Sequence, residues 1–103
     1  MDRIATLSEI LSQDPNNALA RYGLAMEHSN SGQFDSALVE FQKLISTSPD
    51  YAAAYFMAAQ TLVKAGRSDD AKKMLVDGIA AAGRSRNSHA ASEMQGMLDD
   101  LSH

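Results

Sequence analysis

The sequence contains no cysteine and no tryptophan, and it has only two prolines and six other aromatic residues. Without cysteine, the chain can form no disulfide, no thiolate nucleophile and no cysteine-ligated metal site. The longest purely apolar run, residues 51–59, has nine residues, whereas a helix that spans a bilayer needs about 20. No apolar segment follows the charged residues after Met1, so we expect no signal peptide. These absences favour an intracellular, cytoplasmic domain.

Basic residues are also scarce: 9 stand against 13 acidic ones, which gives a net charge of −4 and a pI near 5.1. An acidic protein is poorly suited to phosphate backbones and anionic lipids, so we expect neither nucleic acid nor membrane as partner. The imbalance lies in residues 1–50, with three basic and seven acidic side chains, because residues 51–103 have six of each. This asymmetry would steer an acidic partner towards the second half.

The residues that usually carry catalysis or bind metals are few and scattered. None of His28, His89 and His103 has a partner at metal-ligand spacing, and His28 is expected to be a packing residue. The pairs Asp69–Asp70 and Asp99–Asp100 are adjacent in sequence, so on a helix their side chains would point about 100° apart. Such pairs are poor candidates for a general acid and base. We therefore expect no enzyme, no cofactor and no metal.

A basic segment, residues 83–88, precedes the last expected helix. A helix N-terminus beside arginines can hold a phosphate. However, the glycine spacing and the lysine of a phosphate-binding loop are missing here. We interpret this segment as a solvated connector, with an anion site as the alternative.

The common residues favour helices. Seventeen alanines, ten leucines and six methionines stand against three valines, four isoleucines and three threonines. Alanine, leucine and methionine are good helix formers, whereas β-branched residues favour strands. The composition therefore predicts an all-α protein, built from thin layers of closely packed helices.

Breaker and capping residues recur at regular intervals. Pro15 and Pro49 each end one helix, and Asn16, Asn17 and Asp50 are expected to cap the helices that follow. The segments between these residues predict helices near residues 2–13, 17–30, 34–47, 51–65, 68–82 and 88–101.

These residues repeat at a spacing of 34. Each copy consists of a helix, a turn whose glycine takes left-handed backbone angles, and a second helix. The single-domain chain is thus divided into an N-terminal helix (1–14), repeat 1 (15–48), repeat 2 (49–83) and a C-terminal capping helix (84–103). The matched pairs include Pro15 with Pro49, Ala25 with Ala59, Gly32 with Gly66, Asp35 with Asp69 and Ala37 with Ala71.

A 34-residue helix–turn–helix period is typical of the tetratricopeptide repeat. The junction at residues 14–17 (Asp-Pro-Asn-Asn) and the turn at residues 32–37 (Gly-Gln-Phe-Asp-Ser-Ala) resemble those of this family. The resemblance implies antiparallel helix–turn–helix repeats stacked into an α-solenoid of five to six helices, with small residues where paired helices cross. The sequence departs from the family pattern at Arg21, His28, Ser68, Gly78 and Gly83.

Two repeats alone would expose apolar faces at both ends, and the flanking helices are expected to seal them. The first carries an inner stripe of Leu7, Ile10 and Leu11. The last carries a longer one of residues spaced by three and four: Ala91, Met94, Met97, Leu98 and Leu101.

In this family the first helix of each repeat lines a concave groove that grips peptides. Both first helices here show a second apolar face, so the resemblance implies a non-catalytic interaction module or scaffold with a protein or peptide partner. The alternative is a self-associating subunit, a homodimer that uses Met94 and Met97 and has its groove occluded. A monomer or a weak homodimer is expected. The predicted groove residues are Leu19, Tyr22, Met26, Phe56, Gln60 and Lys64.

Overall fold

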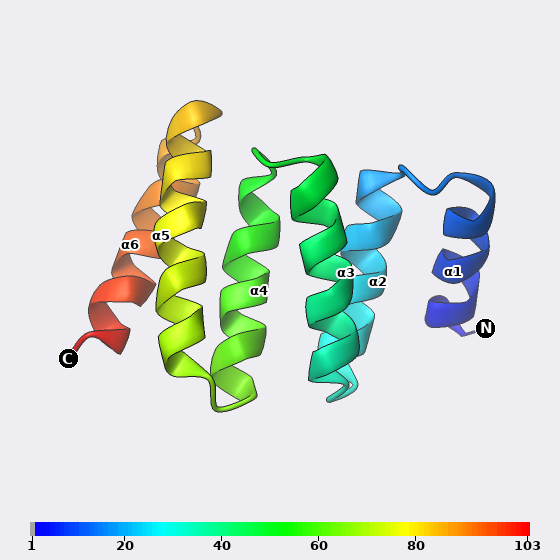
Figure 1. The fold of residues 1–103 in the computed structure, drawn as a ribbon, viewed down its shortest axis with the longest axis horizontal. Helices are drawn as coiled ribbons and strands as arrows, with labels where there is room; N and C mark the ends of the chain where they lie inside the picture. Colours follow the sequence, from blue (N-terminus) through cyan, green and yellow to red (C-terminus); the bar gives the residue numbers. More distant parts are fainter. Residues whose placement is uncertain (1) are drawn as a thin grey trace.

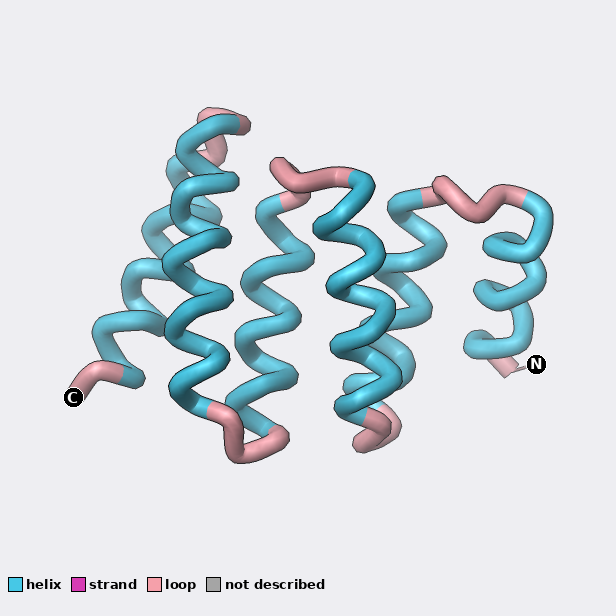
Figure 2. Tube along the Cα trace, viewed as in Figure 1, coloured by secondary structure: helices cyan, strands magenta, loops and turns pink. Residues whose placement is uncertain are grey.

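The computed structural model describes residues 2–103, and within this range the chain forms six helices and no strand (Figures 1 and 2). This confirms the predicted all-α architecture. The predicted ends agree with the observed ones to within two residues. The helices are α1 (Arg3–Gln13), α2 (Ala18–Asn30), α3 (Phe34–Thr47), α4 (Ala52–Lys64), α5 (Ser68–Arg84) and α6 (Ser88–Leu101).

Side-chain caps explain where three helices begin. Asp2 accepts a hydrogen bond from the backbone N–H of Ile4, at 3.0 Å. Asn17 does the same for α2, and Asn87 for α6. The predicted cap at Asp50 is wrong, because Tyr51 is the capping residue of α4 and its side chain makes no cap hydrogen bond. The Asp50 carboxylate instead accepts a 2.6 Å hydrogen bond from Arg84.

The turns between paired helices follow the predicted chemistry. Gly32 and Gly66 have φ angles of 78° and 77°, in the region that glycine adopts without steric cost. The predicted end of the fifth helix at residue 82 is two residues short. Because Gly83 replaces a proline there, the helix continues to Arg84, and the chain turns at Arg86, whose φ is 56°.

The six helices form two layers. Each helix packs against its neighbours in sequence, α2 also contacts α4, and α4 also contacts α6. In the described part of the chain, α1, α3 and α5 make no comparable contact with one another. In Figure 1, α3 and α5 lie in front of α2 and α6. We call the layer of α2, α4 and α6 the inner layer and that of α1, α3 and α5 the outer layer.

Small residues let the paired helices approach closely. Ala25 and Ala37 are fully buried where α2 crosses α3, and Ala59 and Ala71 are fully buried where α4 crosses α5. This confirms the small residues predicted at the crossings. The largest fully buried side chains are Phe41, Leu44, Leu75, Met94 and Thr61.

The flanking helices seal the two ends unequally. In α6 the predicted stripe is buried or half-buried, and Met94 has no exposed surface. In α1, Leu7 and Leu11 pack against Leu24. The inward position predicted for Ile10 is wrong: it remains 39% exposed on an edge that the described helices leave open. None of the helices within residues 2–103 is both long and apolar enough to span a membrane.

Candidate functional site

The predicted groove residues all lie on α2 and α4, which contact each other in the inner layer. Leu19, at the start of α2, is 73% exposed. The other exposed large apolar side chains of the described residues, Ile10, Val39 and Val76, are 39–55% exposed. Lys64 is also exposed, and Gln60 is half-buried. These three side chains are the part of the predicted groove most open to a ligand.

The other three predicted residues are shared between the surface and the core. Tyr22 packs edge-on against Phe41, with ring centroids 6.4 Å apart, and lies 5.6 Å from the ring of Tyr51. Burial, and secondarily the charge of Tyr51, raises the pKa of the Tyr22 phenol. Tyr22 and Met26 pack against the core cluster that contains Phe41, and Phe56 packs against the core cluster that contains Leu75. Substituting these residues would therefore disturb packing as well as the surface.

A buried hydrogen bond joins the two groove helices. The hydroxyls of Ser29 on α2 and Thr61 on α4 lie 2.9 Å apart, and Thr61 also donates to the carbonyl of Met57, at 2.8 Å. Both residues are almost completely buried. This bond fixes the spacing of α2 and α4, and hence the width of the surface between them.

α6 extends the inner layer beyond α4, which sequence reasoning did not include in the site. α6 contacts α4 and begins with a capping asparagine, Asn87, as α2 begins with Asn17. It therefore occupies the position that the first helix of a third repeat would have. The capping asparagine was the signal available in the sequence. The exposed side chains of α6 are polar, and they include Ser92, Glu93, Gln95, Asp99 and Asp100. The inner layer is thus apolar at α2 and acidic at α6.

The departure from the family pattern at Arg21 has a structural explanation. Arg21 donates a hydrogen bond to the carbonyl of Pro15, at 2.9 Å. Tyr55, 34 residues later, donates to the carbonyl of Pro49, at 2.6 Å. Two different side chains therefore secure equivalent junction carbonyls. Arg21 also pairs with Glu40 of α3 at 2.6 Å, with both side chains largely buried.

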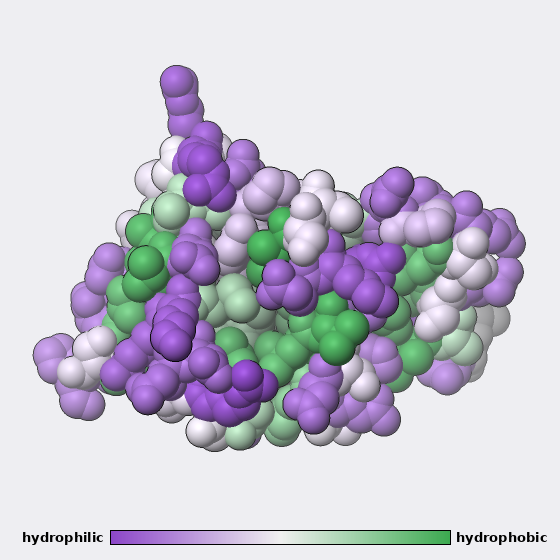
Figure 3. Space-filling view, viewed as in Figure 1, coloured by the Kyte–Doolittle hydropathy of each residue, from purple (hydrophilic) through white to green (hydrophobic). Residues whose placement is uncertain are grey.

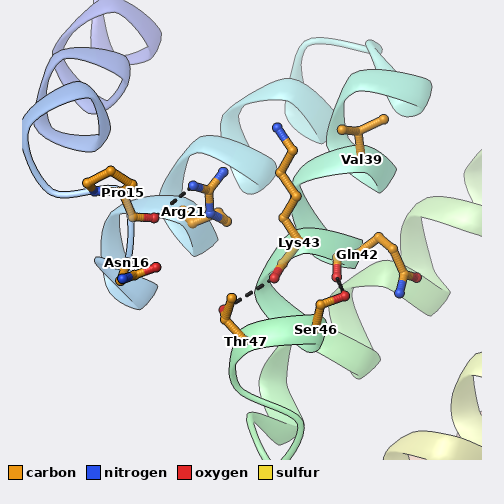
Figure 4. Close-up of a pocket in the computed structure, with 8 residues that line it drawn as sticks. All are labelled: Pro15, Asn16, Arg21, Val39, Gln42, Lys43, Ser46 and Thr47. Atoms are coloured by element: carbon orange, nitrogen blue, oxygen red, sulfur yellow. Dashed lines mark hydrogen bonds between the residues drawn. The ribbon is translucent and has the colours of Figure 1, made fainter.

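The outer layer of the described chain carries clefts where its neighbouring helices do not contact one another. One of them, which we call the outer cleft, has a volume of about 520 Å³ and lies between the α1–α2 junction and α3 (Figure 4). Two smaller ones, of about 280 and 260 Å³, lie between α3 and α5. Figure 3 shows apolar surface here, interrupted by polar side chains. The outer cleft is lined by Pro15, Asn16, Arg21, Val39, Gln42, Lys43, Ser46 and Thr47.

Several of the polar residues considered for catalysis have structural partners. Nδ1 of His28 lies 2.9 Å from Oε1 of Gln33, and His89 lies 2.8 Å from Glu93. Asp70 pairs with Arg67 next to the first turn of α5. These contacts are local pairs rather than a convergent set of groups.

The basic segment at residues 83–88 is likewise engaged within the chain. Arg84 donates hydrogen bonds to Asp50 and to the carbonyl of Pro49, at 2.6 and 3.1 Å. Asn87 accepts from the first turn of α6. The Arg84 guanidinium and the backbone N–H of Ala90, which could otherwise donate hydrogen bonds to an anion, thus already have acceptors within the chain.

Self-association through the last helix would need a different surface from the predicted one. Met94 is completely buried, its sulfur lies next to Gly78 of α5, and it belongs to the same core cluster as Tyr55. Met97 is half-buried in the same cluster.

Known proteins share this sequence pattern and this fold. A TPR repeat-containing protein of Pseudomonas aeruginosa is 26% identical over 95% of this chain and 93% of its own length. The solution structure of a Bordetella parapertussis protein superposes with a TM-score of 0.85 at 26% identity, over 99% of this chain and 89% of that one. A tetratricopeptide repeat domain protein from Salinibacter ruber gives 0.79 at 30% identity, over 84% and 88%.

A further structure has the same fold at lower sequence identity. It is the TPR2B domain of yeast Sti1 in complex with pHsp70, with a TM-score of 0.88 at 18% identity, over 96% of this chain and 79% of that one. The sequence model of the tetratricopeptide repeat matches residues 30–93, which is more than half of the chain. The chain therefore belongs to the tetratricopeptide repeat family.

Proposed function

We propose that this protein is a non-catalytic, cytoplasmic interaction module that holds a peptide or a helix of a partner protein against α2 and α4. The proposed contact residues are Leu19, Tyr22, Met26, Phe56, Gln60 and Lys64. The observation that carries the proposal is the exposure of Leu19 (73%) beside half-buried aromatic and methionine side chains. A large apolar side chain left in water gains free energy when a ligand covers it, and methionine and aromatic residues adapt well to such contacts.

The Sti1 domain supports the general mode of action, because it has this fold and was solved in complex with pHsp70. The chemistry of the groove differs from a site for carboxylates. Tyr22 and Met26 occupy the positions where such a site would place lysine and asparagine on the first helix. We therefore expect a ligand that contributes apolar side chains towards α2. Two repeats offer a small contact area, so the affinity should be on the order of micromolar.

The test uses a peptide selected from a random display library against the intact chain. Its affinity is measured by fluorescence anisotropy, and its site by the shifts of backbone amide resonances. We expect Leu19→Ser to weaken binding about tenfold, since roughly 1.5 kcal/mol of apolar burial is lost. Val76→Ser, which replaces a 55% exposed valine on the outer layer, is the matched control.

The choice of Leu19 avoids a confounding effect. Because Tyr22 and Phe56 also contact the core, their alanine variants would lose stability along with any binding surface. The proposal fails if library selection yields no binder. It also fails if selected peptides bind Leu19→Ser and the parent chain equally, or shift amides outside α2 and α4.

A further inference from the structure

The outer cleft lies on the opposite layer from the proposed groove, and its charge is unbalanced. Arg21 and Lys43 line it, while the lining residues of the described chain include no carboxylate. The nearest acidic group, Glu40, is held by Arg21 at 2.6 Å and has a side chain only 12% exposed. Lys43 lies 3.7 Å from the same carboxylate and stays 59% exposed. One carboxylate is thus shared by two cations, which leaves a net positive charge at the cleft.

The remaining lining supplies an apolar wall and hydrogen-bond groups. Val39 is 53% exposed, and it faces the cleft together with the ring of Pro15. Ser46 and Thr47 donate their hydroxyl protons to backbone carbonyls of α3. Figure 4 shows the Lys43 side chain extending between those of Arg21 and Val39. An ammonium group therefore stands next to an exposed aliphatic surface.

The equivalent position in the second repeat has the opposite charge. Thirty-four residues after Lys43 comes Asp77, which lines the clefts between α3 and α5. Val39 is likewise replaced by Lys73. The combination of an aliphatic wall with a net positive charge therefore belongs to the outer cleft rather than to the repeat in general.

We propose that the outer cleft docks an acidic segment of another protein, with an aliphatic side chain on Val39 and Pro15 and a neighbouring carboxylate on Lys43. The local charge of the cleft selects this occupant, although residues 1–50 are acidic as a whole, because a basic segment would face Arg21 and Lys43. The volume of about 520 Å³ accommodates a few side chains of such a segment. This surface shares no lining residue with the proposed groove, so both can be occupied in one molecule.

The probe for the test is a synthetic 12-residue helical peptide with leucines at i and i+4 flanked by glutamates. A second peptide has glutamine, and a third lysine, in place of each glutamate. Titration of the isotopically labelled chain should shift the amide resonances of residues 42–47 with the glutamate peptide. The glutamine peptide should bind about fivefold more weakly, and the lysine peptide more weakly still.

Two lysine variants with the same charge change identify the layer that binds. Lys43→Glu should weaken the glutamate peptide at least fivefold and restore binding of the lysine peptide, which a merely misfolded variant would not do. Lys64→Glu, on the inner layer, should leave the affinity for the glutamate peptide unchanged. Val39→Ser should weaken it about fivefold through loss of apolar contact.

Several outcomes would overturn the proposal. They are equal affinity for the glutamate and glutamine peptides, no effect of Lys43→Glu, or shifts confined to α2, α4 and α6. The last result would place the acidic peptide in the inner groove and leave the function proposed above intact. Conversely, a failure of the Leu19 test would not affect the predictions for Lys43 and Val39.

Discussion

Gly78 lies in the middle of α5 at its closest approach to α4, and replacing it with alanine tests the packing of these two helices. A Cβ atom at this position would lie 2.6 Å from Cβ of Tyr55 and 2.5 Å from the sulfur of Met94. Carbon atoms in good contact are about 3.5–4.0 Å apart. The Met94 side chain can rotate away, but Cβ of Tyr55 is attached to the backbone of α4. The two helices must therefore separate by about 1 Å.

Two opposing contributions decide the effect of Gly78→Ala. Alanine favours a helix over glycine by about 0.5–1 kcal/mol. Forcing an extra carbon into a packed interior costs about 1–3 kcal/mol. The steric contribution is the larger one, and we expect a net loss of about 1 kcal/mol. In a domain of this size, that loss lowers the melting temperature by about 4–8 °C.

Gly96 provides the matched control, because it lies in α6, where an added Cβ atom would have no neighbour within 4 Å. Gly96→Ala should gain the helix contribution alone, about 0.5–1 kcal/mol. Both variants are measured by urea unfolding followed by circular dichroism. If Gly78→Ala stabilises the protein as much as Gly96→Ala does, the close approach of α4 and α5 is refuted.

Three further substitutions probe other features. Thr61→Val should lower the free energy of unfolding by about 1–2 kcal/mol, because the buried Ser29 hydroxyl loses its partner. In urea unfolding, the double variant with Ser29→Ala should recover part of this loss. A double variant whose loss equals the sum of the two single losses would argue against the bond. Arg86→Gly should raise the melting temperature, since glycine adopts a φ of 56° without strain worth about 1 kcal/mol; a decrease would contradict the turn geometry. The pKa of Tyr22 is raised by burial, so its contribution to stability is present below the unfolded-state pKa of about 10 and is lost as pH rises through the folded-state value. Tyr22→Phe should accordingly keep more of its pH 9 stability near pH 11 in denaturant titrations, and an unchanged pH dependence would contradict this assignment.

The helices and their order were predictable because each signal is local. Prolines, glycine turns and the 34-residue spacing act over a few residues, and small residues at Ala25 and Ala59 mark where helices cross. The errors arose where a side chain acts at a distance. Asp50 caps no helix because Arg84, 34 residues later, binds its carboxylate. Gly83 marked no helix end, because in the absence of proline the helix simply continues.

The candidate sites were predictable to different degrees. Helical periodicity placed Leu19, Gln60 and Lys64 on one layer, but it could not show that Tyr22 and Phe56 are also shared with the core. The outer cleft has no signature in the sequence. It forms where the α1–α2 junction meets α2 and α3, so its existence depends on how residues far apart in the sequence are brought together by packing.

The separation of the outer helices has a mechanical consequence. The inner helices of the described chain contact one another and the outer helices do not, so any change in the curvature of the stack would alter the outer gaps more than the inner contacts. A segment bound in the outer cleft, between the α1–α2 junction and α3, would consequently alter the radius of curvature of the opposite surface. Thermodynamic linkage makes such an effect reciprocal, so that each ligand would change the affinity of the other by the same factor. If both proposed surfaces are used, occupancy of the outer cleft and of the inner groove would then be coupled through the curvature of the stack.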